Sequence, residues 1–194
     1  METETPDKLG YFMPSEWAKH DATWLSWPKN PLTFPARVIA GVEQTYCSMI
    51  SALSEGEKIK LLVDDEKSEE SAFRKLSDYG CKEKSLEFHK IKSADVWIRD
   101  YGLTYLLNRN SRGSGNSANA GKKGAVKWIY NSYGGKYEDL AYDNIAGEDL
   151  ARAEAKEGVR VFHPGIVLEG GSIEVDGEGT LLTTEQCLLN KNRN

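Results

Sequence analysis

The chain has 194 residues, enough to bury a hydrophobic core in one large domain or two small ones. Its formal net charge of −5 argues against a nucleic-acid-binding protein, because no basic face would offset the repulsion from phosphate. No apolar run reaches transmembrane length, and the first residues lack the basic and apolar regions of a signal peptide. We therefore expect a globular, cytoplasmic protein without membrane contact.

Apolar periodicity in the first half of the chain predicts strands that alternate with helices. After a polar, frayed start over residues 1–10, the expected elements are a strand over 22–27, a helix over 38–53, a strand over 58–63, a helix over 68–79 and a strand over 86–91. Pro28 halts the first strand, and Gly80 ends the second helix. This alternation favours the α/β class.

A charged pair follows the next apolar run. Val96-Trp97-Ile98 has the composition of a short buried strand, and Arg99-Asp100 follows it directly. A carboxylate at such a strand end suits a planar cation such as guanidinium, because its two oxygens can accept two parallel N–H groups. The alternative is that Arg99 and Asp100 only cap the strand and pair with other side chains.

The second half contains a polar, glycine-rich stretch over residues 110–124, which we expect to be a flexible loop insertion. The elements expected around it are strands over 103–107, 125–130 and 159–162, a helix over 148–157, and a hairpin turning at 176–179. Gly170-Gly171 precedes this hairpin, and paired glycines permit either close backbone approach to a ligand or positive φ. Either way, the adjacent Glu169 is predicted to lie at the edge of a cavity.

A weak internal repeat links three acidic residues. Asp21, Asp100 and Glu169 each precede an apolar, strand-like segment, with strand and helix material between them. This pattern predicts equivalent units set around an axis.

Four segments together resemble one known family. They are His20–Pro28, Trp97–Asp100, Tyr133–Tyr137 and Leu168–Asn194, and they are similar to agmatine deiminases of the bacterial peptidylarginine deiminase family. The resemblance implies a pentein fold, an α/β propeller of five pseudo-equivalent units. Residues 1–194 would then be the N-terminal part of a single pentein domain, incomplete in this chain.

The resemblance also implies an activity. Agmatine, a small-molecule substrate, would be hydrolysed to N-carbamoylputrescine and ammonia in putrescine biosynthesis, with no metal and no cofactor. The mechanism would be covalent, through a cysteine thiolate that attacks the guanidinium carbon. No nucleic acid or membrane partner is implied, and a homo-oligomer is left open.

Three residues acquire expected roles from their positions in these motifs. Asp100 is similar to the family's guanidinium-binding aspartate, and Glu169 to its second catalytic carboxylate. Trp97 would line the substrate pocket as an apolar or cation–π wall. The alternative for Trp97 is packing in the core.

The chain departs from the family pattern in two respects. Leu103 stands where the family usually has proline, so a restraint on the turn after Asp100 is absent. The family's nucleophilic cysteine and His-x-Asp motif lie beyond the segment that ends at Asn194, so these 194 residues alone are expected to be inactive. Buried structural thiols are predicted for Cys47, Cys81 and Cys187, and structural or surface roles for His20, His89 and His163.

Two alternatives to this function remain. One is an inactive partial propeller that binds guanidinium compounds or a partner chain and self-associates through exposed sheet edges. The other is a deiminase for peptidyl-arginine or arginine, in which Arg99 could contact the carboxylate or backbone that agmatine lacks.

Overall fold

The computed structural model describes residues 5–109 and 123–194, which form two compact units. One unit is continuous, Lys19–Ile98, and the other, here called the discontinuous unit, combines the residues up to Ala18 with Arg99–Asn194. Most of the expected loop over 110–124 lies outside the described residues.

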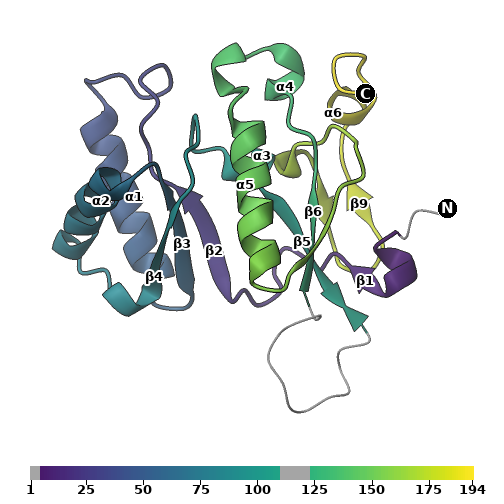
Figure 1. The fold of residues 1–194 in the computed structure, drawn as a ribbon, viewed down its shortest axis with the longest axis horizontal. Coiled ribbons are helices and arrows are strands. Elements are labelled where there is room, and N and C mark those ends of the chain that lie inside the picture. The colour runs from purple at the N-terminus through teal and green to yellow at the C-terminus, as the bar shows by residue number, and fades with distance from the viewer. Residues whose placement is uncertain (1–4, 110–122) are drawn as a thin grey trace. The chain divides into compact units, whose positions relative to one another are not determined.

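The Lys19–Ile98 unit is a three-stranded parallel sheet with two helices that contact each other and β3 (Figure 1). Its elements are β2 (Ala22–Ser26), α1 (Ile39–Leu53), β3 (Lys58–Val63), α2 (Glu66–Asp78) and β4 (Leu86–Lys90). The central strand β3 pairs with both neighbours, and its apolar side chains are buried. The predicted alternation of strands and helices is confirmed in this unit.

Helix α2 begins two residues before its predicted start because of a capping box. The Asp65 carboxylate accepts the N–H of Ser68 at 2.8 Å, and the Ser68 hydroxyl accepts the N–H of Asp65 at 2.9 Å. These two hydrogen bonds satisfy backbone donors that the first helical turn leaves unpaired.

The prediction of a strand over Val96-Trp97-Ile98 is wrong. The cause is Asp95, whose fully buried carboxylate accepts hydrogen bonds from Asn30 Nδ2 at 3.0 Å, from the Thr33 hydroxyl and from the N–H of Val96 at 2.7 Å. These bonds hold the chain in a loop after β4. Asp100 therefore lies on a single helical turn, α3 (Ile98–Tyr101), rather than at a strand end.

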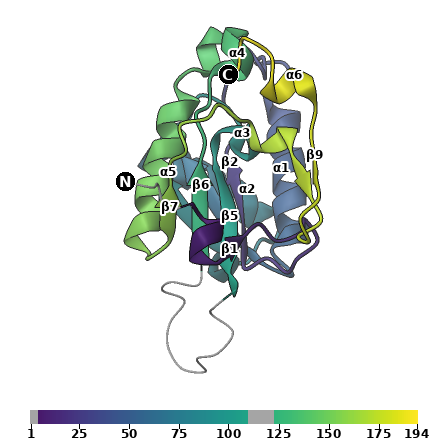
Figure 2. The same cartoon turned by 90° about the vertical axis from the view of Figure 1, so that its right-hand side faces the viewer.

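The discontinuous unit contains a four-stranded mixed sheet in the order β1-β5-β6-β7, with α5 packed against β5, β6 and β7 (Figure 2). Its longer elements are β1 (Tyr11–Phe12), β5 (Leu103–Asn108), β6 (Lys123–Lys127), α5 (Asp143–Lys156) and β7 (Arg160–Phe162). The largest differences from prediction concern β6 and α5. Strand β6 begins two residues before the expected range of 125–130, with Lys123 and Gly124, which we had placed in the loop, and it ends three residues before the end of that range. Helix α5 begins five residues earlier than expected.

The shorter elements of this unit include the predicted hairpin and two short helices that sequence analysis did not predict. They are α4 (Ser132–Gly135), the antiparallel strands β8 (Glu174–Val175) and β9 (Leu181–Leu182), and α6 (Glu185–Leu188). The hairpin around residues 176–179 is therefore confirmed. Its turn lies against the N-terminal segment, where a Cβ on Gly177 would be 2.7 Å from the backbone nitrogen of Ser15.

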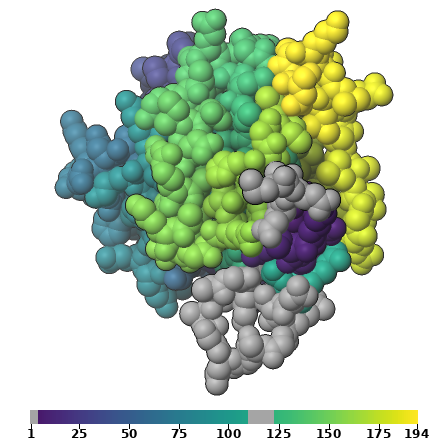
Figure 3. All heavy atoms as spheres, turned by 45° about the vertical axis from the view of Figure 1, so that its right-hand side comes forward, coloured from purple at the N-terminus to yellow at the C-terminus, as the bar shows by residue number. Residues whose placement is uncertain are grey.

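The N-terminal segment is more ordered than predicted. Residues Asp7–Leu9 form a 3-10 turn that leads into β1, where we had expected a frayed end. Figure 3 shows this segment (dark purple) beside the C-terminal residues (yellow) on the surface of the unit. None of the helices in the described ranges is long and apolar enough to cross a membrane.

Two helical glycines provide a matched test of packing in this fold. A Cβ on Gly147 of α5 would clash with the Tyr101 carbonyl and lie 2.5 Å from Cε of the buried Lys127, whereas a Cβ on Gly41 of α1 would meet nothing within 4 Å. We predict that Gly147→Ala lowers the free energy of unfolding by about 1–3 kcal/mol through overpacking. Gly41→Ala should instead raise it by about 0.5–1 kcal/mol through helix propensity. Urea denaturation measures both, and equal effects would contradict this packing.

Candidate active site

The carboxylate of Asp100 is fixed by two hydrogen bonds within the discontinuous unit. Its Oδ2 accepts the hydroxyl of Tyr133 at 2.6 Å, and its Oδ1 accepts the N–H of Gly171 at 3.0 Å. An ionised carboxylate has about four acceptor positions, so each oxygen keeps acceptor capacity for a further donor. The side chain is only partly buried, so a planar cation can approach these positions.

The Gly170-Gly171 pair is required because two chain segments approach each other closely here. A Cβ on Gly170 would collide with the Arg99 carbonyl, and one on Gly171 would collide with Oδ1 of Asp100. Neither glycine has positive φ. Of the two predicted reasons for the glycine pair, positive φ is wrong, and the close approach observed is to another segment of the chain.

Glu169 lies directly before these glycines and is almost fully buried, with 3% of its surface exposed. Arg193 Nε lies 2.7 Å from Glu169 Oε1, an ion pair that is not aligned as a hydrogen bond. Burial raises the pKa of the Glu169 carboxyl, and the positive charge of Arg193 acts in the opposite direction. The two predicted carboxylates thus meet different surroundings, because Asp100 is only partly buried and Glu169 is enclosed.

Tyr133 reaches Asp100 from a left-handed turn. Ser132, Tyr133, Gly134 and Gly135, the residues of α4, all have positive φ, between 56° and 81°. For a non-glycine residue this conformation costs roughly 1–2 kcal/mol. The side chain of Asn131 stabilises the turn by accepting the N–H of Gly134 at 2.8 Å.

The C-terminal segment holds this turn from the other side. A Cβ on Gly134 would collide with the side chains of Asn192 and Arg193, and Asn131 Nδ2 donates to the carbonyl of Asn192 at 2.8 Å. Arg193 therefore contacts both the turn that carries Tyr133 and the carboxylate of Glu169.

Sequence analysis gave no role to Tyr133 or Arg193, although both lie in segments that carry the family resemblance. The available signal was the tyrosine before Gly134-Gly135, since consecutive glycines indicate positive φ. No comparable signal marks Arg193, because its partner Glu169 is distant in the sequence.

Arg99 is paired with another side chain, as the alternative interpretation of the Arg99-Asp100 pair predicts. Its guanidinium donates to both carboxylate oxygens of Glu16, at 3.1 and 2.5 Å, and its Nε donates to the Gly170 carbonyl at 3.3 Å. Arg99 thus anchors the same close approach that brings Gly171 to Asp100.

Trp97 belongs to the Lys19–Ile98 unit, and 43% of its surface is exposed. Packing of Trp97 in the core is therefore wrong. Its role as a wall of the substrate pocket stays a prediction.

The cysteines and histidines have the environments of structural residues, with one exception. Cys47 and Cys81 are buried thiols, as predicted, and burial raises the pKa of each. Cys187 is partly exposed, so its predicted burial is wrong. Each histidine lies near a glutamate; the pairs are His20 with Glu57, His89 with Glu87, and His163 with Glu148.

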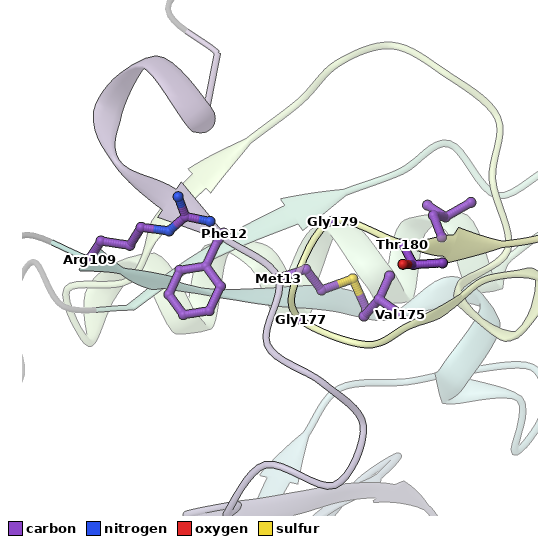
Figure 4. A pocket seen from close by; sticks show the side chains of 8 residues that line it. Phe12, Met13, Arg109, Val175, Gly177, Gly179 and Thr180 are labelled. Atoms are coloured by element: carbon purple, nitrogen blue, oxygen red, sulfur yellow. The ribbon is translucent and has the colours of Figure 1, made fainter.

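The described residues contain no cluster of metal-binding side chains, and one cavity among them is not lined by the predicted site residues. Over residues 5–109 and 123–194, no three His, Cys, Asp or Glu side chains gather closely enough to hold a metal ion. A cavity of about 220 Å³ lies between β1 and the β8–β9 hairpin (Figure 4). Phe12, Met13, Arg109 and hairpin residues line it, and Asp100 and Glu169 do not.

Comparison with known proteins places this geometry in a family. Residues 12–194 match the profile of the Porphyromonas-type peptidyl-arginine deiminases. The chain is 35% identical over 191 residues to a putative agmatine deiminase of Legionella pneumophila and 36% identical over 194 residues to the agmatine deiminase of Stutzerimonas stutzeri. These alignments cover 97% and 99% of this chain but 49% and 48% of the two relatives, so the chain spans about half their length.

Solved structures agree with this assignment. An X-ray structure of a putative agmatine deiminase superposes with a TM-score of 0.81 at 32% identity, covering 98% of this chain and 49% of the other. The agmatine deiminase of Enterococcus faecalis gives 0.80 at 26% identity, covering 100% and 49%.

The chain is thus an α/β protein of the pentein class with an incomplete propeller, as predicted. It belongs to the Porphyromonas-type peptidyl-arginine deiminase family. That residues 1–194 are part of a single pentein domain stays a prediction.

The hydrogen bond between Tyr133 and Asp100 predicts a dependence of stability on pH. Burial, and then the bond to Asp100, raise the pKa of the Tyr133 phenol. Above about pH 10 the unfolded chain releases this proton while the folded chain retains it, so stability falls as pH rises. Tyr133→Phe should therefore lose stability less steeply between about pH 9 and about pH 11. Urea denaturation across this range measures the slopes, and equal slopes would contradict the bond.

Proposed function

We propose that the chain carries the carboxylate part of an agmatine deiminase, an enzyme that hydrolyses agmatine to N-carbamoylputrescine and ammonia in putrescine biosynthesis. The observation that supports this most is the carboxylate of Asp100, which two donors orient while acceptor positions on both oxygens remain. The similar proteins from Stutzerimonas stutzeri and Enterococcus faecalis are both named agmatine deiminases.

The charges around Asp100 favour a cationic ligand. Arg99 is paired with Glu16, and Arg193 with Glu169, so each of these cations is balanced by its own carboxylate. Asp100 then leaves one net negative charge in the cluster. A guanidinium, which is planar and permanently protonated, matches such a carboxylate with two parallel N–H donors.

The chemical step requires a nucleophile beyond these residues. In the proposed reaction a cysteine thiolate adds to the guanidinium carbon, and the C–N bond to the leaving nitrogen breaks as ammonia departs with an added proton. Water then adds to the same carbon and breaks the C–S bond, which restores the thiol and gives the urea product. Cys47 and Cys81 are buried thiols, and the family resemblance implies a nucleophile beyond the segment that contains Cys187, so we place it in a longer polypeptide.

In this proposal Asp100 binds and orients the guanidinium, and Glu169 supplies a second negative charge behind it. Trp97 contributes an apolar wall. The protein is proposed to be cytoplasmic, to act on a small molecule without a cofactor, and to form a homo-oligomer if a partner surface is completed by the longer chain.

Two alternative functions are less well supported. A site for arginine or peptidyl-arginine would need a cation for the additional carboxylate or backbone, and Glu16 already occupies Arg99. A binding module that self-associates is favoured by one feature, the exposure of Leu181, Leu182 and Leu189 in the β9–α6 region.

The binding role of Asp100 is tested by calorimetry with the 194-residue chain. We predict that agmatine binds and that putrescine, which carries an ammonium in place of the guanidinium, binds at least about tenfold more weakly. Asp100→Asn should weaken agmatine binding by at least about tenfold. Asp149→Asn, on the exposed surface of α5, is the matched control and should bind like the unchanged chain. Equal binding of agmatine and putrescine, or of the two variants, would reject this role.

The catalytic proposal is tested by ammonia release. The 194-residue chain should bind agmatine without releasing ammonia, because the nucleophile is placed outside it. Intact mass of the natural protein, read with the coding sequence downstream of Asn194, shows whether a longer polypeptide exists. A longer form should release ammonia from agmatine and lose this activity in Asp100→Ala. A natural protein that ends at Asn194 and shows no turnover would refute the proposed enzyme and favour the binding module.

A further inference from the structure

Arg193 has two contacts that no part of the proposed reaction uses. Its guanidinium lies against the enclosed Glu169 carboxylate, and the same side chain fills the space beside Gly134 in the left-handed turn. Both side chains of the ion pair are largely buried, with 10% of Arg193 and 4% of Glu169 exposed. A permanently charged group has thus been buried beside one of the two carboxylates of the site.

We propose that Arg193 is a positioning residue of the cation site: it holds Glu169 as a carboxylate and closes the turn that brings Tyr133 to Asp100. This inference rests on the proposed function and assigns a role to a residue outside the reacting groups. Through Arg193, the two carboxylates are held by one short segment near the C-terminus.

The electrostatic part of this role follows from burial. An ionised carboxylate removed from water is unfavourable unless a countercharge compensates it. Burial raises the pKa of Glu169, and Asp100 acts in the same direction, whereas Arg193 lowers it. The phenols of Tyr130, which is buried, and Tyr133, which is partly buried, also lie in this cluster, and each experiences the charge of Asp100. Arg193 is therefore the side chain that favours the charged form of Glu169.

The geometric part follows from the turn. Two non-glycine residues, Ser132 and Tyr133, are held at positive φ, a conformation that an unsupported chain disfavours. The side chains of Asn192 and Arg193 occupy the space that a Cβ on Gly134 would need. The turn and the C-terminal segment are therefore closely packed, which fixes the position of the Tyr133 hydroxyl on Asp100.

The consequence is a cation site whose charge depends on Arg193. With Arg193 present, its positive charge acts against the effect of burial on the pKa of Glu169. Without it, the pKa of Glu169 rises further, so this group becomes charged only at a higher pH. Cation affinity should then increase with pH, because the site gains a negative charge.

The test compares Arg193→Gln, which removes the charge, with Arg193→Lys, which retains it. Calorimetry of agmatine binding by the 194-residue chain should give the weaker dependence of affinity on pH in the unchanged chain and in Arg193→Lys. In Arg193→Gln the affinity should increase more steeply as pH rises, because Glu169 becomes charged at a higher pH there. The double variant Arg193→Gln/Glu169→Gln should lose this added increase, because the titrating group is gone.

If the role of Arg193 is purely structural, Arg193→Gln should weaken agmatine binding equally at every pH. The double variant should then show the same dependence of affinity on pH as Arg193→Gln, and that outcome overturns the proposal. The same holds if Arg193→Lys behaves like Arg193→Gln. Thermal unfolding of each variant identifies any that does not fold.

A second readout separates this inference from the proposed function. Carbon-13 NMR of glutamate carboxyls, with Glu169 assigned through Glu169→Gln, follows its titration without ligand. Glu169 should titrate at a higher pH in Arg193→Gln than in the unchanged chain and in Arg193→Lys. If agmatine does not bind the unchanged chain, the proposed function fails, while this titration still decides whether Arg193 controls Glu169.

Discussion

The candidate site depends on the close approach of Gly170-Gly171 to Arg99-Asp100. Because neither glycine has a Cβ, the two backbones lie close enough for the Gly171 N–H to bind Asp100 and for the Gly170 carbonyl to bind Arg99. The same approach places Glu169 beside the cluster. A side chain at either glycine would separate these segments and remove both hydrogen bonds, so the geometry of the site follows from two absent methyl groups.

The second physical feature of the site is the pairing of its charges before any ligand arrives. Glu16 balances Arg99, Arg193 balances Glu169, and the Tyr133 hydroxyl orients Asp100. Groups held in this way lose little conformational freedom when a ligand binds, because their ordering has already been paid for in folding. A cation would therefore meet a carboxylate whose direction is fixed rather than one that must reorient.

Sequence reasoning reached the elements that local patterns determine. Apolar periodicity predicts helix α1 and strand β3, and a glycine-rich turn predicts the β8–β9 hairpin. It failed where a single buried polar side chain overrides composition: Asp95 directs Val96–Ile98 out of the sheet, although these residues favour a strand. Asp100 and Glu169 were placed by family resemblance. Tyr133 and Arg193 were missed because their partners are remote in sequence, and the exposure of Trp97 could not be inferred from an apolar run.

The left-handed turn over Ser132–Gly135 also bears on the order in which this part of the chain assembles. With two non-glycine residues at positive φ, at a cost of roughly 1–2 kcal/mol each, an isolated peptide of this sequence has little tendency to adopt it. Besides the local hydrogen bond from Gly134 to Asn131, the contacts that stabilise the turn come from Asn192 and Arg193, some sixty residues later. Closure of that long loop must accompany the turn, so the phenol reaches Asp100 late in folding. A ribosome-bound chain in which Asn192 and Arg193 have not yet been released would have its sheet but no completed cation site.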